Sequence, residues 1–179
     1  MMTVPQRYRV PIIAIVAVAL VVLVGGAIAL VAGSGPPASS SPPATVAPSA
    51  TDPGATPASA VRAFFTAFAE AGRIDDPAVV APFVTGPTSS AYLSAAGFLN
   101  GEKAVGKASV TTVLRLDNLH VIQSGNSASV SFDYVEGGYD IDPKTGQPLE
   151  TPTILPMTKV VAVVKEIGGR WLVDSYQSQ

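Results

Sequence analysis

The first long pattern along the chain is a run of apolar residues. Residues 11–32 read PIIAIVAVALVVLVGGAIALVA, which is 22 residues without a charged or strongly polar side chain. As a helix this run would extend over about 33 Å, enough to cross a hydrocarbon core of about 30 Å. A cleavable signal peptide is the alternative, but its apolar part is usually only about 7–15 residues long. We therefore expect an uncleaved transmembrane helix over residues 11–32.

The basic residues near this run predict its orientation. Arg7 and Arg9 lie just before it, and the next basic residue is Arg62. Because short cytoplasmic segments carry an excess of Lys and Arg, residues 1–10 should be a cytoplasmic tail. The sequence thus predicts a single-pass protein of the plasma membrane, whose larger part lies outside.

The stretch after the apolar run has the composition of a spacer. Residues 33–57 contain seven prolines in 25 positions, and most of the others are Gly, Ser, Ala or Thr. Such a segment has almost nothing apolar to bury. We expect a disordered tether that leads into a domain over residues 58–179, which is long enough to form one core.

Helical periodicity begins at the end of this spacer. Thr56 can cap a helix whose first residue is Pro57, and Gly72 is a candidate for its end. The spacing i, i+3, i+4, i+7 defines one apolar face. Its members are Val61, Phe64, Phe65 and Phe68.

Two shorter helices should follow the first. Asp76 and Pro77 can open one that runs to about Val84. The next is expected over residues 89–100, with Gly101 at its end. Together with Phe132 of a later strand, the aromatic side chains of the three helices are interpreted as core rather than as the lining of a cavity. They are Phe64, Phe65, Phe68, Phe83, Tyr92 and Phe98.

From residue 110 the periodicity changes from that of a helix to that of a strand. Apolar and polar residues alternate over 110–116 and again in Val130, Phe132 and Tyr134, as in half-buried strands. Asp117-Asn118 interrupts the alternation and predicts a bulge or a tight bend. The segment 124–126 predicts a turn between the two strands.

The remaining segments predict a meander of further strands. Gly137-Gly138 suggests a bend, residues 142–146 a turn, and Pro148, Pro152 and Pro156 an edge or irregular segment. Residues 159–167 are almost continuously apolar, which is typical of a central strand covered on both faces. Residues 170–177 would form the last strand. Helices followed by antiparallel strands indicate an α+β domain.

Composition excludes several classes of function. The chain has 11 basic residues, 13 acidic residues and no cysteine. Without clustered Lys and Arg it cannot neutralise nucleic-acid phosphates, so we expect no nucleic-acid partner. Without cysteine there is no disulfide, thiolate metal site or lipoprotein anchor.

The closing strand carries a family resemblance. The order of three helical segments and an antiparallel meander, ending in Gly169-Arg170-Trp171-Leu172-Val173-Asp174, resembles the nuclear-transport-factor-2-like superfamily over residues 57–179. The resemblance implies helices packed on a curved, cone-like sheet. The superfamily includes isomerases, dehydratases, carriers and structural modules. The layout is also similar to that of scaffold components of conjugation and type IV secretion machines, and of mammalian-cell-entry-associated membrane proteins.

The candidate chemistry of the domain is sparse. Isomerases of that superfamily use an Asp base with Tyr and acid donors in the cone, and no matching motif positions are identified here. Tyr134, Asp174 and Tyr176 are the candidate ligand-binding residues. His120 is the only histidine, alternation points it outward, and one histidine cannot form a zinc site, so we expect no metal and no cofactor.

Two functions remain open from the sequence. One is a non-catalytic scaffold of a bacterial cell envelope, which docks another envelope protein or a second copy through the open face of its sheet. The alternative is a small-molecule carrier or isomerase-like domain that uses the cone as a pocket. The sequence favours a non-enzymatic role without excluding an enzymatic one.

Overall fold

The computed structural model describes residues 52–179. The predicted cytoplasmic tail, the transmembrane helix and the spacer up to residue 51 lie outside the described residues. Among residues 52–179, no helix is both long enough and apolar enough to cross a membrane.

Helix α1 (Pro57–Ile74) begins where the sequence predicts. The hydroxyl of Thr56 accepts a hydrogen bond from the backbone N–H of Ser59 at 3.1 Å, and the Ser59 hydroxyl accepts one from the N–H of Thr56 at 2.9 Å. This reciprocal pair satisfies two N–H groups that the first helical turn leaves without partners. The predicted N-cap and the Pro57 start are therefore confirmed.

The predicted end of α1 at Gly72 is wrong. The helix continues to Ile74, and Asp75 takes the left-handed conformation with φ of 52°. Gly72 is buried inside the helix, where an added Cβ would lie 3.5 Å from Ser109 of the sheet. That distance is an ordinary van der Waals contact, so Gly72 is simply an interior residue of the helix.

The second predicted helix is divided into two short 3₁₀ turns, η1 (Pro77–Val79) and η2 (Ala81–Phe83), and Asp76 caps the first as expected. Helix α2 (Ser90–Ala104) is capped by Ser89 and runs past Gly101, so the predicted end at that glycine is wrong.

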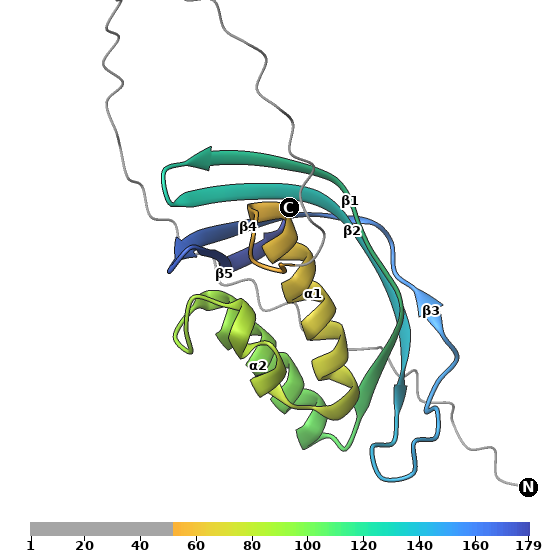
Figure 1. Cartoon of the computed structure of the whole chain (residues 1–179). Helices are drawn as coiled ribbons and strands as arrows, with labels where there is room; N and C mark the ends of the chain where they lie inside the picture. The colour runs from red at the N-terminus through yellow and green to blue at the C-terminus, as the bar shows by residue number, and fades with distance from the viewer. Residues whose placement is uncertain (1–51) are drawn as a thin grey trace, which may run out of the picture. The chain divides into compact units, whose positions relative to one another are not determined.

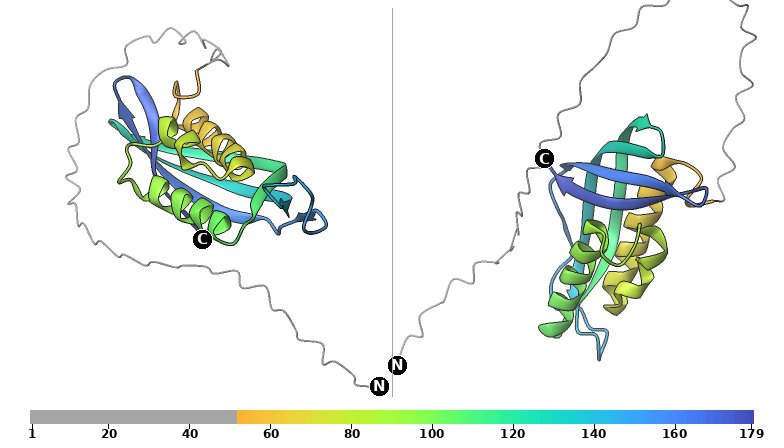
Figure 2. Two further views of the ribbon diagram at one scale, coloured as in Figure 1. Left: turned by 90° about the horizontal axis from the view of Figure 1, so that it is seen from below. Right: turned by 90° about the vertical axis from the view of Figure 1, so that its left-hand side faces the viewer.

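Five strands form one antiparallel sheet in the order β1-β2-β4-β5. Strands β1 (Ala108–Ser124) and β2 (Ser127–Ile141) make a long curved hairpin, and α1 and α2 lie on one side of the sheet (Figures 1 and 2). The short β3 (Thr153–Ile154) pairs only with Gly137 and Gly138 of β2. Strands β4 (Thr158–Ile167) and β5 (Arg170–Ser178) complete the meander. The predicted α+β class, with helices packed on a curved antiparallel sheet, is confirmed.

Two irregularities shape the β1–β2 hairpin. The pairing shifts register between Asp117 and His120, and Asn118 has a φ of 53°, which confirms the predicted bulge. A second shift lies between Thr111 and Val113, opposite Gly138. A Cβ at position 138 would lie 2.1 Å from the carbonyl oxygen of Val110, so the close approach of the two backbones requires glycine there.

The core lies between the helices and the side of the sheet that they cover. Phe65 of α1 is its aromatic centre, with ring centroids 5.2 Å from Phe64 and 5.4 Å from Phe132. The predicted core role of these rings is confirmed, except that Phe98 is 49 % exposed. Most of the other fully buried residues are small or β-branched. They include Val61, Val80, Ala91, Ala95, Val130, Ala162, Val164 and Val173.

Strand β4 is central, as predicted, but it is not covered on both faces. Val160, Ala162 and Val164 are buried under the helices. Val161 and Val163 alternate with these residues, so they point to the opposite face, and they are only half-buried. No helix covers that face in the described structure (Figure 2). We call this uncovered side the open face. The neighbours of these valines across the ladder are polar, because serine and glutamine occupy β2 and β5 there. They are Ser129, Ser131, Ser175 and Gln177.

Candidate functional site

Two of the three predicted ligand-binding residues lie at the aromatic core. The ring centroid of Phe65 is 5.1 Å from that of Tyr134 and 5.4 Å from that of Tyr176. Burial raises the pKa of Tyr176 to about 12 and also raises the pKa of Tyr134 above its ordinary value. Both hydroxyls therefore stay protonated at neutral pH and can only donate or accept hydrogen bonds there.

An acid that the sequence analysis did not select belongs to the same place. The Tyr134 hydroxyl donates a hydrogen bond to Glu136 Oε2 at 2.7 Å, and Thr111 Oγ1 donates to Glu136 Oε1 at 3.2 Å. Residues 134 and 136 are two apart on one strand and so share a face, and this spacing could have identified Glu136 from the sequence. Glu136 therefore orients the hydroxyls of Tyr134 and Thr111 through one hydrogen bond to each of its oxygens.

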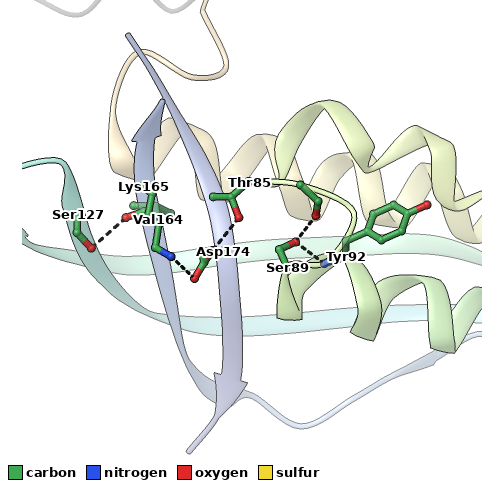
Figure 3. A network of polar contacts seen from close by, with 8 residues as sticks. Thr85, Ser89, Tyr92, Ser127, Val164, Lys165 and Asp174 are labelled. Carbon is green, nitrogen blue, oxygen red and sulfur yellow. Dashed lines mark hydrogen bonds and ion pairs between the residues drawn. The ribbon is translucent and has the colours of Figure 1, made fainter. Parts of the chain in front are cut away.

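The third predicted residue, Asp174, makes different contacts. Its carboxylate accepts a hydrogen bond from Thr85 Oγ1 at 2.7 Å and pairs with Lys165 Nζ at 2.9 Å (Figure 3). Burial acts to raise the pKa of Asp174, but the hydrogen bonds from Lys165 and Thr85 outweigh it and hold the pKa below its ordinary value. Asp174 thereby ties the loop before α2 to β4 and β5. The structure brings the two tyrosines together but gives Asp174 other partners.

Two side chains follow the strand alternation expected of them. Asp133 points away from Tyr134 and binds Lys159 Nζ at 2.9 Å and Asn118 Nδ2 at 2.8 Å. His120 is exposed, as expected. Within residues 52–179 there is no group of three or more His, Cys, Asp or Glu side chains that could hold a metal ion.

Two hollows lie on the surface of the domain. One, of about 300 Å³, lies between α1 and β1, and its lining is Arg62, Thr66 and residues 114–117. The other, of about 330 Å³, lies where Asp133 and Lys159 meet the end of the chain at Gln179. Neither hollow is lined by Tyr134, Asp174 or Tyr176.

A run of exposed aliphatic side chains follows β2. Leu149, Ile154, Leu155 and Met157 are each between 51 % and 63 % exposed. The backbone N–H of Leu149 donates to Asp140 O and that of Leu155 to Glu136 O, both at 2.8 Å, so this segment is held beside β2. We call residues 149–157 the apolar edge segment. Its prolines predicted an irregular edge correctly, but its exposed aliphatic character was missed.

Comparison with known proteins finds no matching protein family and no matching curated protein. Solved structures do match, and one of them is a nuclear transport factor 2-like superfamily protein from Salmonella enterica. It has 14 % identity, a TM-score of 0.45, and coverage of 66 % of this chain and 87 % of that one. Another is a putative dehydratase of the same family from Streptomyces avermitilis, with 15 % identity, a TM-score of 0.46 and coverage of 69 % and 97 %.

A third similar structure is a nuclear transport factor 2-like protein with a cystatin-like fold from Novosphingobium aromaticivorans. It has 11 % identity, a TM-score of 0.43 and coverage of 68 % of this chain and 80 % of that one. The superfamily named from the closing strand is thus represented among the structures to which this chain is similar. At these scores and identities, the activities of those proteins say nothing about this one.

Proposed function

We propose that the chain is a non-catalytic interaction module of a bacterial cell envelope, held at the plasma membrane by residues 11–32. Its outer domain docks another envelope protein or a second copy of itself. The observation that carries this proposal is the apolar edge segment, where four large aliphatic side chains within nine residues are about half exposed or more. Single exposed aliphatic residues are common, whereas such a group is typical of a binding surface.

The interior of the domain supports the same choice. Aromatic rings fill the space between α1 and the sheet, with centroids about 5 to 6 Å apart. Glu136, the acid nearest to the tyrosines, already accepts two hydrogen bonds. Neither of the two surface hollows is lined by Tyr134 or Tyr176. The exterior therefore offers more for binding than the interior does.

The chemistry of the edge segment limits how a partner binds. Pro152 and Pro156 flank Thr153–Ile154 and have no N–H to donate, so a further strand cannot extend the sheet here. Contact must come from the side chains of Ile154, Leu155 and Met157. We expect an apolar groove or patch on the partner rather than an added strand.

Photo-crosslinking in the full chain tests this proposal. A photoreactive amino acid at position 155 should give crosslinks to one protein species in intact cells. The same amino acid at the exposed position 123, at the far end of β1, should give none. Leu149→Ser should weaken the crosslinks, because it removes apolar area from the surface without altering a hydrogen bond of the backbone. Equal crosslinking at positions 155 and 123 would count against the proposal.

The membrane placement has its own test. The chain contains no cysteine, so Gln123→Cys gives one thiol at an exposed site. A membrane-impermeant maleimide should label it in intact cells if the domain lies outside. Labelling only after lysis would refute the orientation predicted from Arg7 and Arg9.

Small-molecule binding in the cone is the second candidate, and one observation favours it. The polar pair of Tyr134 and Glu136 lies among aromatic rings, and within residues 52–179 the Tyr176 hydroxyl has no hydrogen-bond partner. A ligand with one hydrogen-bonding group could use that hydroxyl. Native mass spectrometry distinguishes the outcomes: added mass that is lost on denaturation favours the candidate, and a bare protein mass rejects it.

A further inference from the structure

Two arginines of the domain lack the ion pairs that most of its other basic residues make. Residues 52–179 contain all 13 acidic residues of the chain but only nine basic ones. Five of these nine form ion pairs, namely Arg73, Lys107, Lys159, Lys165 and Arg170. Arg62 and Arg115 do not, although acids are in excess. An unpaired guanidinium in an acidic domain is a free recognition group for carboxylates.

Both arginines line the same hollow, the one of about 300 Å³ between α1 and β1. Arg62 and Thr66 lie one turn apart on α1, so they share one face of the helix. Arg115 of β1 lies on the other side of this strand edge, because Leu114 and Leu116 face the core and successive residues of a strand face opposite ways. The two guanidinium groups and the Thr66 hydroxyl are all exposed, and each can donate hydrogen bonds to a bound anion.

The rest of the lining is the outer edge of a strand. Strand β1 is terminal in the sheet and pairs only with β2 in the described structure. In an antiparallel ladder, alternate residues of an edge strand direct their N–H and C=O groups outward. Register shifts at Thr111/Val113 and Asp117/His120 bracket the regular stretch Val113–Asp117. The hollow is therefore lined by Leu114–Asp117 of this edge, where alternate residues direct their backbone N–H and C=O groups outward.

We propose that this edge binds an extended acidic segment of a partner protein, which adds as a strand beside Val113–Asp117. Main-chain hydrogen bonds to the edge would hold the segment, and its carboxylates would bind Arg62 and Arg115. Asp117 repels acid at its own end and so fixes the register. A small free anion would use the arginines but not the consecutive residues of the edge. The proposal extends the interaction module described above by naming a partner chemistry, and its residues are separate from the apolar edge segment.

Fluorescence anisotropy on the purified full chain in detergent tests the site. The probe is a labelled peptide that repeats valine-glutamate-glutamate, so that adjacent glutamates face Arg62 and Arg115 on the two sides of the edge. The comparison peptides replace glutamate with lysine or the central valine with proline. We expect the acidic peptide to bind and the other two to bind at least tenfold more weakly. Arg62→Gln and Arg115→Gln should each weaken binding about fivefold to tenfold, because each removes a charge-assisted contact. The matched control is Lys144→Gln, which removes a charge from an exposed turn outside any ion pair, and it should leave affinity unchanged.

Four results would overturn the inference. They are no binding of the acidic peptide, equal binding of the proline peptide, equal weakening by Lys144→Gln, and displacement of the probe by inorganic phosphate as effective as by unlabelled peptide. Thermal melts of each variant show whether it is folded, and Arg115→Lys, which keeps the charge, should retain more affinity than Arg115→Gln. Crosslinking from position 155 should not respond to these substitutions, so failure of this site and failure of the proposed function are distinguishable.

Discussion

Gly138→Ala should destabilise the domain strongly, since it forces apart the two longest strands. The added Cβ would lie 2.1 Å from Val110 O, whereas such contacts are essentially never closer than 3.0 Å. The strands must therefore separate by roughly 1 Å, which strains the core packing by about 1–3 kcal/mol and weakens at least one ladder hydrogen bond by about 1 kcal/mol. We expect the free energy of unfolding to fall by about 2–4 kcal/mol.

Urea unfolding followed by circular dichroism measures this loss. Gly97→Ala is the matched control, because position 97 lies in α2 with nothing within 4 Å of an added Cβ. The same substitution there should stabilise by about 0.5–1 kcal/mol, since alanine is the better helix former. If Gly138→Ala lost less than about 1 kcal/mol, or if the two variants changed stability in the same direction, the close approach at Gly138 would not be the reason for glycine there.

Two further predictions concern buried or bonded acids. Asp75 is only 6 % exposed, and its Oδ1 has no hydrogen-bond partner among residues 52–179. Burial raises its pKa. The contribution of Asp75 to stability is therefore greatest at acid pH and is lost as pH rises through the folded-state pKa. Asp75→Asn should therefore raise the melting temperature at pH 7 and not at pH 3, whereas Glu150→Gln, at an exposed position, should do neither. The pKa of Asp174 is lowered, so its contribution is present above the unfolded-state pKa and is lost as pH falls. Asp174→Asn should cost about 1 kcal/mol at pH 7, and the difference should shrink as pH falls through the lowered folded-state pKa. A loss independent of pH would contradict the role of its charge.

Local chemistry was the part of the fold that could be predicted. The start of α1 depends on Thr56, Ser59 and Pro57, which lie within four residues of one another. The bulge at Asn118 depends on a residue type that tolerates positive φ. The inward and outward sides of Asp133 and Tyr134 follow from strand alternation alone. Each of these features is set by near neighbours, and the sequence displays near neighbours directly.

The ends of helices could not be predicted in the same way. Gly72 and Gly101 both predicted helix ends, yet α1 continues to Ile74 and α2 to Ala104. Asp75, which is not glycine, takes the left-handed position instead. Glycine permits a left-handed helix end but does not require one, and only the tertiary structure shows which residue takes that conformation.

The candidate sites show the same division. The sequence selected Tyr134, Asp174 and Tyr176 by type, and strand alternation could have added Glu136. The sequence could not show that the Asp174 side chain turns to Lys165 and Thr85. The reason is a bulge in the β4–β5 ladder, where the pairing shifts register between Val163 and Val164 of β4. A bulge changes the direction of every side chain beyond it, and its position depends on the partner strand.

The sequence by itself determined the α+β class, the start of α1, the bulge in β1 and the polar character of the outward positions of β1. These depend on periodicity and on contacts between near neighbours. Only the tertiary structure decided which faces are covered. It left Val161 and Val163 half-exposed on the open face, and it placed Arg62 of α1 and Arg115 of β1 in the lining of one hollow. Burial and pairing across the sheet depend on residues far apart in the chain, and no local pattern records them.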